Sequence, residues 1–486
     1  MNSKVIFYFL GKICMAFTCT LMIPICMAIF YAEHCVAVFS LAALISLILG
    51  YGLTKFGKNA NLAKVSVREG IGTVFFSWIL IALIASLPFS LGGYLSPAAA
   101  YFESMSGLTT TGATAFSDLE ILPQSILMWR SITHWIGGIG IIVLFVAFLP
   151  QMAGSAQYLF NAEVSGFSSS RIKPRIETTA IELFKIYATL TFLLIAILWG
   201  TGMNLYDSIY HSFSAIATGG FSNYNSSVGH YDNAWYEFIL GLFMLLAGGN
   251  FALYYSAANG QGIKSIWKNL EFRAYIYFVG TITFMITANL VYDMGQPFFY
   301  SLRVAFFHVS SFCSTTGFVG VDYEQWPSFS KLLLAMTFFT GACAGSTAGG
   351  IKICRLIVLM KTVGAELRRA LHPQMLLTVY YDKKRLPVST IISISRFFFL
   401  YIFTVVILGL GVSATGLPVE ESIFGVASCV SSVGPSFGQV GATGNFAGVT
   451  DIAKLIFSLG MLLGRLELFT ALALLRSEYW RKSERW

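Results

Sequence analysis

Residues 108–116 read LTTTGATAF, a cluster of three threonines that runs directly into a glycine. The chain around this polar cluster is strongly apolar: 56% of its 486 residues are hydrophobic, only 11% are charged, and the mean hydropathy is +0.71. A soluble domain would carry about twice that charged fraction. Apolar stretches of about 20 residues recur from end to end, so the sequence predicts an all-α polytopic membrane protein. A strand-rich membrane barrel needs short alternating segments, which this sequence lacks.

Lysine and arginine cluster in six short regions that are separated by strips almost free of basic residues. Strips 91–129, 201–235 and 413–453 contain none, and strip 291–330 contains only Arg303. Because cytoplasmic loops are enriched in basic residues, we expect these strips to face outward and both termini to be cytoplasmic. The net charge of +8 is then explained by the basic cytoplasmic loops and by a rim of the protein that contacts membrane lipid. No nucleic-acid partner is expected.

Motifs for enzyme chemistry or resident cofactors are missing from the sequence. There is no HExxH and no P-loop, and GGIGIIV at 137–143 lacks the last glycine of a dinucleotide fingerprint. The eight cysteines show no metal-ligand spacing, so we interpret them as reduced core residues. The first apolar stretch, 6–31, is too long for a signal peptide and is interpreted as a membrane span.

The glycine of the opening stretch has a counterpart in each of the other outward strips. An aromatic residue lies ten positions before each glycine, and a serine lies six positions before it. The four glycines are Gly112, Gly220, Gly317 and Gly434, the aromatic residues are Phe102, Tyr210, Phe307 and Phe424, and the serines are Ser106, Ser214, Ser311 and Ser428. Recurrence at two fixed offsets predicts four internal repeats.

Each repeat is predicted to contain a first span, a short re-entrant helix with the glycine, and a second span. The first spans are expected near 71–93, 178–203, 272–293 and 391–413, and the second spans near 128–150, 236–257, 331–360 and 453–475. Two further spans, near 6–31 and 35–51, precede them, which makes ten in all. The predicted units are an extension at 1–60 and repeats at 61–160, 161–260, 261–375 and 376–486.

A glycine flanked by hydroxyl groups is suited to a site where backbone carbonyl groups coordinate a cation. Irregular backbone at membrane depth is tolerated only where it lines a cavity, and glycine adopts backbone angles closed to other residues. Four such segments from parallel repeats can surround one pseudo-fourfold axis, with carbonyl and hydroxyl oxygens replacing the water of a weakly hydrated ion. This favours K⁺ over Na⁺. The alternative that each glycine merely caps a helix stays open at this point.

Several motifs resemble the superfamily of K⁺ transporters, and within it the bacterial Trk-type potassium uptake membrane subunits (TrkH/TrkG type). The resemblance spans nearly the whole chain and rests on SGLTTTGAT (106–114), ATGGFS (217–222), TTGF (315–318), VGP (433–435), KPRIETTA (173–180), GACAGSTAGGIK (341–352), LHP (371–373) and GRLELFT (464–470). It implies four span–pore helix–span repeats around one pore, a homodimer in the bacterial inner membrane, and a cytoplasmic nucleotide-binding TrkA-type partner. K⁺ would be the transported ion, and no cofactor is expected in this chain.

The same resemblance assigns a K⁺ selectivity filter. Its glycines would be the four identified above, and sodium-selective plant relatives replace the first with serine. The residues supplying oxygens to K⁺ would be Thr110, Thr111, Thr218, Gly219, Thr315, Thr316, Ser432 and Val433. Ser436 departs from the glycine that many relatives have in the fourth segment; because it lies beyond the filter glycine, the departure concerns the geometry of the outer mouth more than the selectivity.

A gate is predicted where glycines interrupt the second span of the third repeat, at 341–350. Each glycine costs about 1 kcal/mol in a helix interior, so four should break the helix there. The predicted gate residues are Gly341, Gly345, Ser346, Thr347, Gly349, Gly350, Lys352 and Arg465. Arg465 is an intramembrane charge, which the resemblance places in the pore against the loop. Close helix packing by small residues and an arginine that reaches the inner surface are the simpler alternatives.

Three polar residues lie nine positions before their glycines: Glu103, His211 and His308. We expect them to anchor the short helices by hydrogen bonds rather than to bind ions, and we expect Arg303 to be structural. An enzyme built on these three is disfavoured, since repeats would hold them apart. The remaining alternative function is a secondary K⁺ symporter driven by H⁺ or Na⁺, although such folds usually have inverted repeats.

Overall fold

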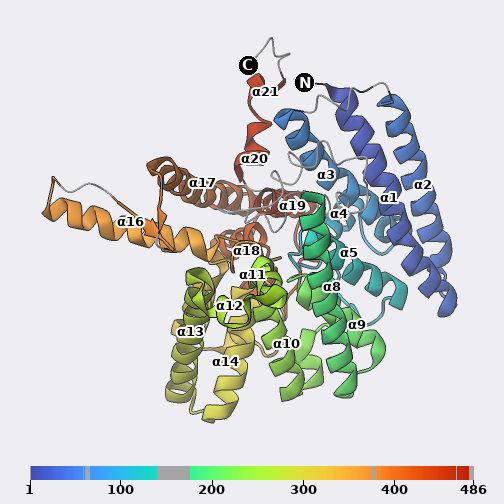
Figure 1. Ribbon diagram of the computed structural model, residues 1–486. Coiled ribbons are helices and arrows are strands. Elements are labelled where there is room, and N and C mark those ends of the chain that lie inside the picture. Colours follow the sequence, from blue (N-terminus) through green and yellow to red (C-terminus); the bar gives the residue numbers. More distant parts are fainter. Residues whose placement is uncertain are drawn as a thin grey trace.

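The computed structural model describes residues 2–58, 60, 66–140, 176–374, 378–382, 384–466 and 468–480, and these form a mostly helical protein (Figure 1). The predicted end of the second span of repeat 1, up to residue 150, and the start of KPRIETTA lie outside the described residues. The two strands, β1 (Tyr380–Tyr381) and β2 (Lys384–Arg385), pair antiparallel with Tyr380 opposite Arg385.

Six helices are long and apolar enough to cross a membrane, or seven spans if one bent pair is included, counting the described residues only. The six are α1 (Ser3–Phe30), α2 (Cys35–Phe56), α3 (Val67–Leu91), α8 (Ile176–Gly200), α13 (Leu270–Met294) and α17 (Val388–Ser413). They correspond to the two leading spans and the four predicted first spans. The protein is therefore a multi-pass membrane protein, as the hydropathy predicts.

Four short helices follow the first spans. They are α4 (Pro97–Leu108), α9 (Leu205–Ile216), α14 (Phe298–Cys313) and α18 (Val419–Ser431). Local sequence fixes where they begin: the Ser96 hydroxyl caps α4 by accepting the Ala99 N–H, and Asn204 caps α9 by accepting the Asp207 N–H. Prolines stand at or just before the first turn of the other two, where a missing N–H costs nothing.

Three of the predicted second spans are interrupted, and for those near 236–257 and 453–475 the prediction of a continuous helix is wrong; the predicted span near 128–150 is described only as far as residue 140. The helices are α5 (Gln124–Ile139), α10 (Ala234–Ala247) with α11 (Phe251–Ser256), α15 (Ser328–Phe339) with α16 (Ile353–Leu371), and α19 (Asp451–Arg465) with α20 (Leu468–Ala473). Only the break between α15 and α16 was predicted. The chain turns by 90° between α10 and α11 at Gly248–Asn250, because two glycines and a helix-capping asparagine come together there.

Helix packing follows a cyclic order. Each second-span helix packs on the short helix of the following predicted repeat: α5 on α9, α10 on α14, α15 on α18, and α19 on α4. The last of these contacts joins the end of the chain to its beginning, so the order closes on itself. The leading helices α1 and α2 lie side by side at one edge and pack on α3 (Figure 1).

Short segments complete the described chain. They are η3 (Ser227–Tyr231), the π-helical turn η4 (Ala257–Gln261), α12 (Lys264–Lys268), η5 (Tyr323–Gln325), η6 (Gly438–Val440) and α21 (Ser477–Trp480). Helix α21 lies at the same end of the molecule as the start of α1 (Figure 1). The Tyr479 hydroxyl ties it to that end by donating to the Arg68 carbonyl over 2.6 Å.

Candidate functional site

The four short helices all end in the same hydrogen-bonded turn. In each, the N–H of the residue before the glycine donates to the carbonyl of the serine six positions before the glycine. The pairs are Thr111 with Ser106, Gly219 with Ser214, Thr316 with Ser311, and Val433 with Ser428, over 2.8, 2.8, 2.8 and 2.9 Å. This is the Schellman end of a helix. The four matching turns extend the sequence periodicity to the backbone.

The residue two positions before each glycine adopts a left-handed backbone. These residues are Thr110, Thr218, Thr315 and Ser432, with φ between 56° and 58°. Their glycines also have positive φ, at 83°, 78°, 82° and 96°. A left-handed residue with a side chain costs about 1–2 kcal/mol, and strain of this kind gathers at functional sites. The free-energy cost of a left-handed backbone therefore occurs at four equivalent positions.

The glycines lie against one another's segments in a closed ring. A Cβ atom added to any of them would lie under 3.0 Å from a backbone carbonyl oxygen of the next segment. The pairs are Gly112 with Gly219, Gly220 with Thr316, Gly317 with Val433, and Gly434 with Thr111. Every predicted filter glycine thus meets the residue that precedes the next one, and the fourth returns to the first. No side chain fits at these four positions.

A cavity of about 70 Å³ opens on the side of the ring away from the short-helix ends. All four glycines line it, together with Arg130 of α5. Arg130 is 1% exposed and its Nε donates to the Glu103 carboxylate over 2.7 Å. Its Nη1 donates to the Tyr210 hydroxyl and the Ser222 carbonyl over 3.1 and 3.0 Å. The charge of Arg130 is therefore paired, and it links α5 to α4 and α9 behind the ring.

The residues nine positions before the glycines hold the chain that leaves the ring. Glu103 also accepts the Ala115 N–H over 2.7 Å, and His308 accepts the Gly320 N–H through Nε2 over 3.2 Å. His211 Nε2 lies 3.3 Å from the Ser222 hydroxyl. These contacts confirm the expected hydrogen-bonded anchoring. Arg303 pairs with Glu237 over 3.1 Å, in line with its expected structural role.

The segment 340–352 between α15 and α16, here called the intramembrane loop, lies against the inner ends of the glycine segments. Its Gly349 N–H donates to the Thr315 hydroxyl over 2.9 Å. The hydroxyl of Thr347 contacts that of Thr218 over 3.3 Å. A Cβ at Gly349 would collide with the Ser431 carbonyl. The predicted gate residues and the predicted filter residues are therefore in direct contact.

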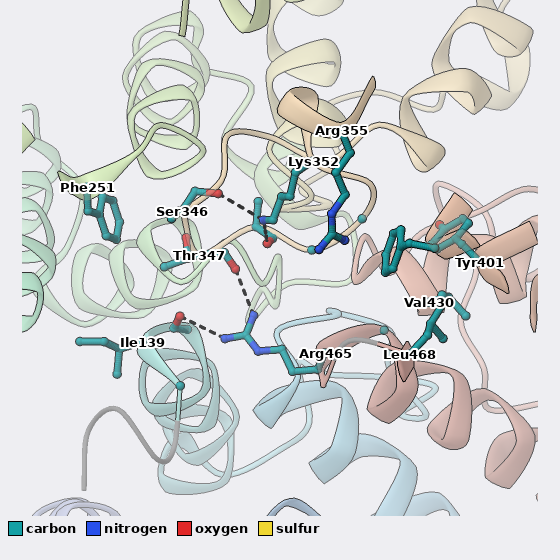
Figure 2. A pocket seen from close by; sticks show the side chains of 18 of the residues that line it. Ile139, Phe251, Ser346, Thr347, Lys352, Arg355, Tyr401, Val430, Arg465 and Leu468 are labelled. Atoms are coloured by element: carbon teal, nitrogen blue, oxygen red, sulfur yellow. Dashed lines mark hydrogen bonds between the residues drawn. The ribbon is translucent and has the colours of Figure 1, made fainter. Parts of the chain in front are cut away.

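Arg465, the last residue of α19, reaches the same place from near the end of the chain (Figure 2). Its guanidinium donates to the Thr347 carbonyl over 3.1 Å and to the Thr110 hydroxyl over 3.4 Å. It also donates to the carbonyls of Gly137 and Gly138, the latter over 3.1 Å, at the end of α5. Arg465 is half-buried and thus joins the end of α5, the glycine segment after α4 and the intramembrane loop.

The bend between α10 and α11 forms a seat for the intramembrane loop, which the sequence reasoning missed. The Gly248 carbonyl accepts the Cys343 N–H over 3.0 Å, and the Phe251 N–H donates to the Gly345 carbonyl over 3.2 Å. The Ala247 carbonyl accepts the Thr347 hydroxyl over 3.3 Å. Carbonyls left without helical partners by the bend thus find partners in the loop. The sequence Gly248–Gly249–Asn250 was the signal available for this break.

A second cavity, of about 130 Å³, lies on the other side of the loop. Gly345, Ser346, Gly350 and Lys352 of the loop line it together with Arg465 (Figure 2). Lys352 points back into the loop, and its ammonium group donates to the Ser346 hydroxyl over 3.5 Å and to the Ala348 carbonyl. The loop and Arg465 therefore separate this cavity from the glycine ring.

Two residues in contact with the candidate site were not predicted from the sequence. Arg130 was one of the few basic residues outside the basic clusters, and a lone charge in an apolar span is a signal in itself. Glu271, in the first turn of α13, is 5% exposed and contacts the intramembrane loop. Its sequence context resembles any acidic residue at the start of a helix, so no local pattern marks it.

Comparisons with known proteins agree along the length of the chain. A family model described as TrkH, cation transport protein, matches residues 37–482. The chain is 35% identical to the Trk system potassium uptake protein TrkH of Salmonella typhimurium, over 99% of this chain and 100% of that protein. It is 32% identical to TrkG of Escherichia coli, over 99% of each. The crystal structure of the potassium transporter TrkH from Vibrio parahaemolyticus superimposes with a TM-score of 0.88 at 33% identity, covering 99% of this chain and 100% of that one.

Proposed function

The chain belongs to the TrkH family of cation transport proteins, and on that premise we propose that it takes up K⁺ through a channel-like pore with a glycine-based filter. The relatives are named as potassium transport proteins, which confirms the resemblance seen in the sequence and the prediction that the chain is not an enzyme. The closed ring of four glycine segments carries the proposal.

The proposed filter is made of backbone. Positive φ at Thr110 and again at Gly112, with an ordinary residue between them, lets successive carbonyls turn toward one side. The same alternation occurs in the other three segments. Four sets of neutral oxygens around one axis can replace the hydration shell of a weakly hydrated monovalent cation. K⁺ gives up its shell more cheaply than Na⁺, so the site favours K⁺.

The intramembrane loop and Arg465 are proposed to form the gate. Thr347 and Gly349 contact filter hydroxyls, and the Arg465 guanidinium lies against Thr110. A fixed positive charge at the inner end of the filter opposes the passage of a second cation. For K⁺ to pass, the loop and the arginine must both move.

The oligomeric state, partner and location of the protein are proposed from its membership of the TrkH family. The Trk system named for the relatives implies several components, and we propose a homodimer, a TrkA-type cytoplasmic regulatory partner, and an inner-membrane location with both termini cytoplasmic. The proposal includes four repeats with the boundaries predicted from the sequence, and no cofactor is proposed for this chain.

The proposal is tested by ⁸⁶Rb⁺ uptake into proteoliposomes that contain the purified full chain and a K⁺ load. We expect uptake that K⁺ suppresses and that an equal concentration of Na⁺ leaves nearly unchanged. Uptake that is absent, or equally sensitive to both ions, contradicts the proposal. In liposomes without the K⁺ load and with the membrane potential held at zero, an imposed pH or Na⁺ gradient separates the two mechanisms, because only a symporter then drives Rb⁺ against its own concentration gradient.

A further inference from the structure

We propose that Glu271 is the positioning residue that holds the intramembrane loop closed. The inference rests on the proposed function, since it concerns the regulation of the same pore. Glu271 lies in the first turn of α13, outside the loop, and its residue is 5% exposed. A carboxylate buried this deeply is retained only where its oxygens are satisfied by strong partners.

The partners of Glu271 come from the two ends of the loop. One carboxylate oxygen, Oε1, accepts the Ala344 N–H over 2.7 Å and the Cys354 N–H over 3.2 Å. Ala344 lies near the start of the loop, and Cys354 lies in the first turn of α16, just beyond its end. The Glu271 side chain, from the neighbouring helix α13, therefore holds together the chain segments that enter and leave the intramembrane loop.

The contact with Cys354 also completes the start of α16. The residue at the cap position of this helix is Lys352, whose side chain makes no capping hydrogen bond. Helix starts prefer a short oxygen-bearing side chain there, because the first N–H groups lack partners and carry partial positive charge. Glu271 supplies that oxygen from another helix. Moving α16 away from α13 would leave both the helix start and the buried carboxylate unsatisfied.

Backbone hydrogen bonds near the Glu271 carboxylate join residues 341–342 to residues 351–353 at the two ends of the intramembrane loop, which are here called its neck. The Gly341 N–H donates to the Ile351 carbonyl over 2.7 Å, and the Ile353 N–H donates to the Ala342 carbonyl over 3.2 Å. Glu271 is the side chain that secures this neck from outside. The contacts at the tip of the loop, to the α10–α11 bend and to Arg465, then hold a segment whose base is already fixed.

A matched control exists in α3. Glu69 lies in the first turn of α3, is also 5% exposed, and accepts backbone N–H groups from Asn2 and Ser66. Its partners are Asn2, at the start of the chain, and Ser66, which caps α3, and neither belongs to the intramembrane loop. Replacement of Glu69 therefore removes a buried carboxylate of the same kind without releasing the proposed gate.

The test compares Glu271→Ala, Glu271→Gln and Glu69→Ala in full-length protein without any partner subunit. Two quantities are measured: passive ⁸⁶Rb⁺ leak, and the alkylation rates of the native thiols Cys343 and Cys354, which are 0% and 3% exposed. Cys429, buried in α18, is the internal reference. We expect Glu271→Ala to raise both the leak and the two alkylation rates about tenfold, the equivalent of one hydrogen bond to a charged group.

The Gln variant keeps an acceptor oxygen and should give a smaller rise, and it carries the test if the Ala variant does not fold. Glu69→Ala should match the parent in leak and in alkylation of Cys343 and Cys354. A folded Glu271 variant with parental leak and parental alkylation overturns the inference. If the parent and all variants lack Rb⁺ flux, the proposed function fails, while the alkylation rates still report whether Glu271 holds the loop.

Discussion

Replacement of Gly112 by serine tests the ring of glycines directly. The new Cβ would lie 2.1 Å from the Gly219 carbonyl oxygen, so the two groups must separate by about 1 Å to reach an ordinary contact. The left-handed backbone adds about 1–2 kcal/mol and overpacking adds about 1–3 kcal/mol. The least constrained response is withdrawal of the Gly219 carbonyl from the axis, which removes one of the oxygens proposed to surround the ion.

Selectivity should suffer more than folding. A tenfold change in ion preference requires only about 1.4 kcal/mol, which is less than the strain placed on the ring. We therefore expect Gly112→Ser to make ⁸⁶Rb⁺ uptake at least tenfold more sensitive to competing Na⁺. The assay is uptake into proteoliposomes over a series of Na⁺ concentrations, with K⁺ competition measured alongside.

The control for this substitution is Gly93→Ser. Gly93 also has a left-handed backbone, with φ of 72°, but an added Cβ meets nothing within 4 Å. It therefore carries the backbone strain without the collision, and its ion selectivity should match the parent. If Gly112→Ser leaves the ratio of Na⁺ to K⁺ competition unchanged in folded protein, the ring does not select the ion and the reasoning is refuted.

Three further substitutions have defined outcomes. Arg465→Ala should raise passive Rb⁺ leak, since it removes the charge between Thr347 and Thr110; leak no higher than that of the parent counts against the gate. Gly349→Ala should also raise the passive Rb⁺ leak, because its Cβ would collide with the Ser431 carbonyl and displace the intramembrane loop; a leak equal to that of the parent would argue against the role of that contact in closing the pore. Arg130→Met should lower the free energy of unfolding by about 3–5 kcal/mol by leaving Glu103 buried without its ion pair; thermal unfolding in detergent measures this, and an unchanged midpoint contradicts it.

Much of the fold followed from two simple patterns in the sequence. Long apolar runs predict α1, α2, α3, α8, α13 and α17, because the bilayer fixes the length of a span. The offsets of the aromatic residue and the serine from Gly112 predict the four equivalent turns, because a helix end imposes the same hydrogen bonds wherever it recurs. The predicted contact of Arg465 with the loop is also present.

The breaks in the second spans could not be predicted so well. Helix propensity alone gives Gly248–Gly249–Asn250 a modest cost, and an apolar window of the same length suits a straight span or a bent one equally. What decides is the intramembrane loop between α15 and α16, which satisfies the carbonyls that the bend exposes. Glu271 escaped prediction for the same reason, since its partners lie more than 70 positions away in the chain.

The most direct test of the central claim is the position of the bound ion. Crystals of the protein grown in Rb⁺ or Tl⁺ should show anomalous density on the axis enclosed by the carbonyls of Thr111, Gly219, Thr316 and Val433, and Na⁺ should not replace it at equal concentration. Density that lies elsewhere, or an empty ring in protein that transports Rb⁺, would contradict a single filter built from four segments of one chain.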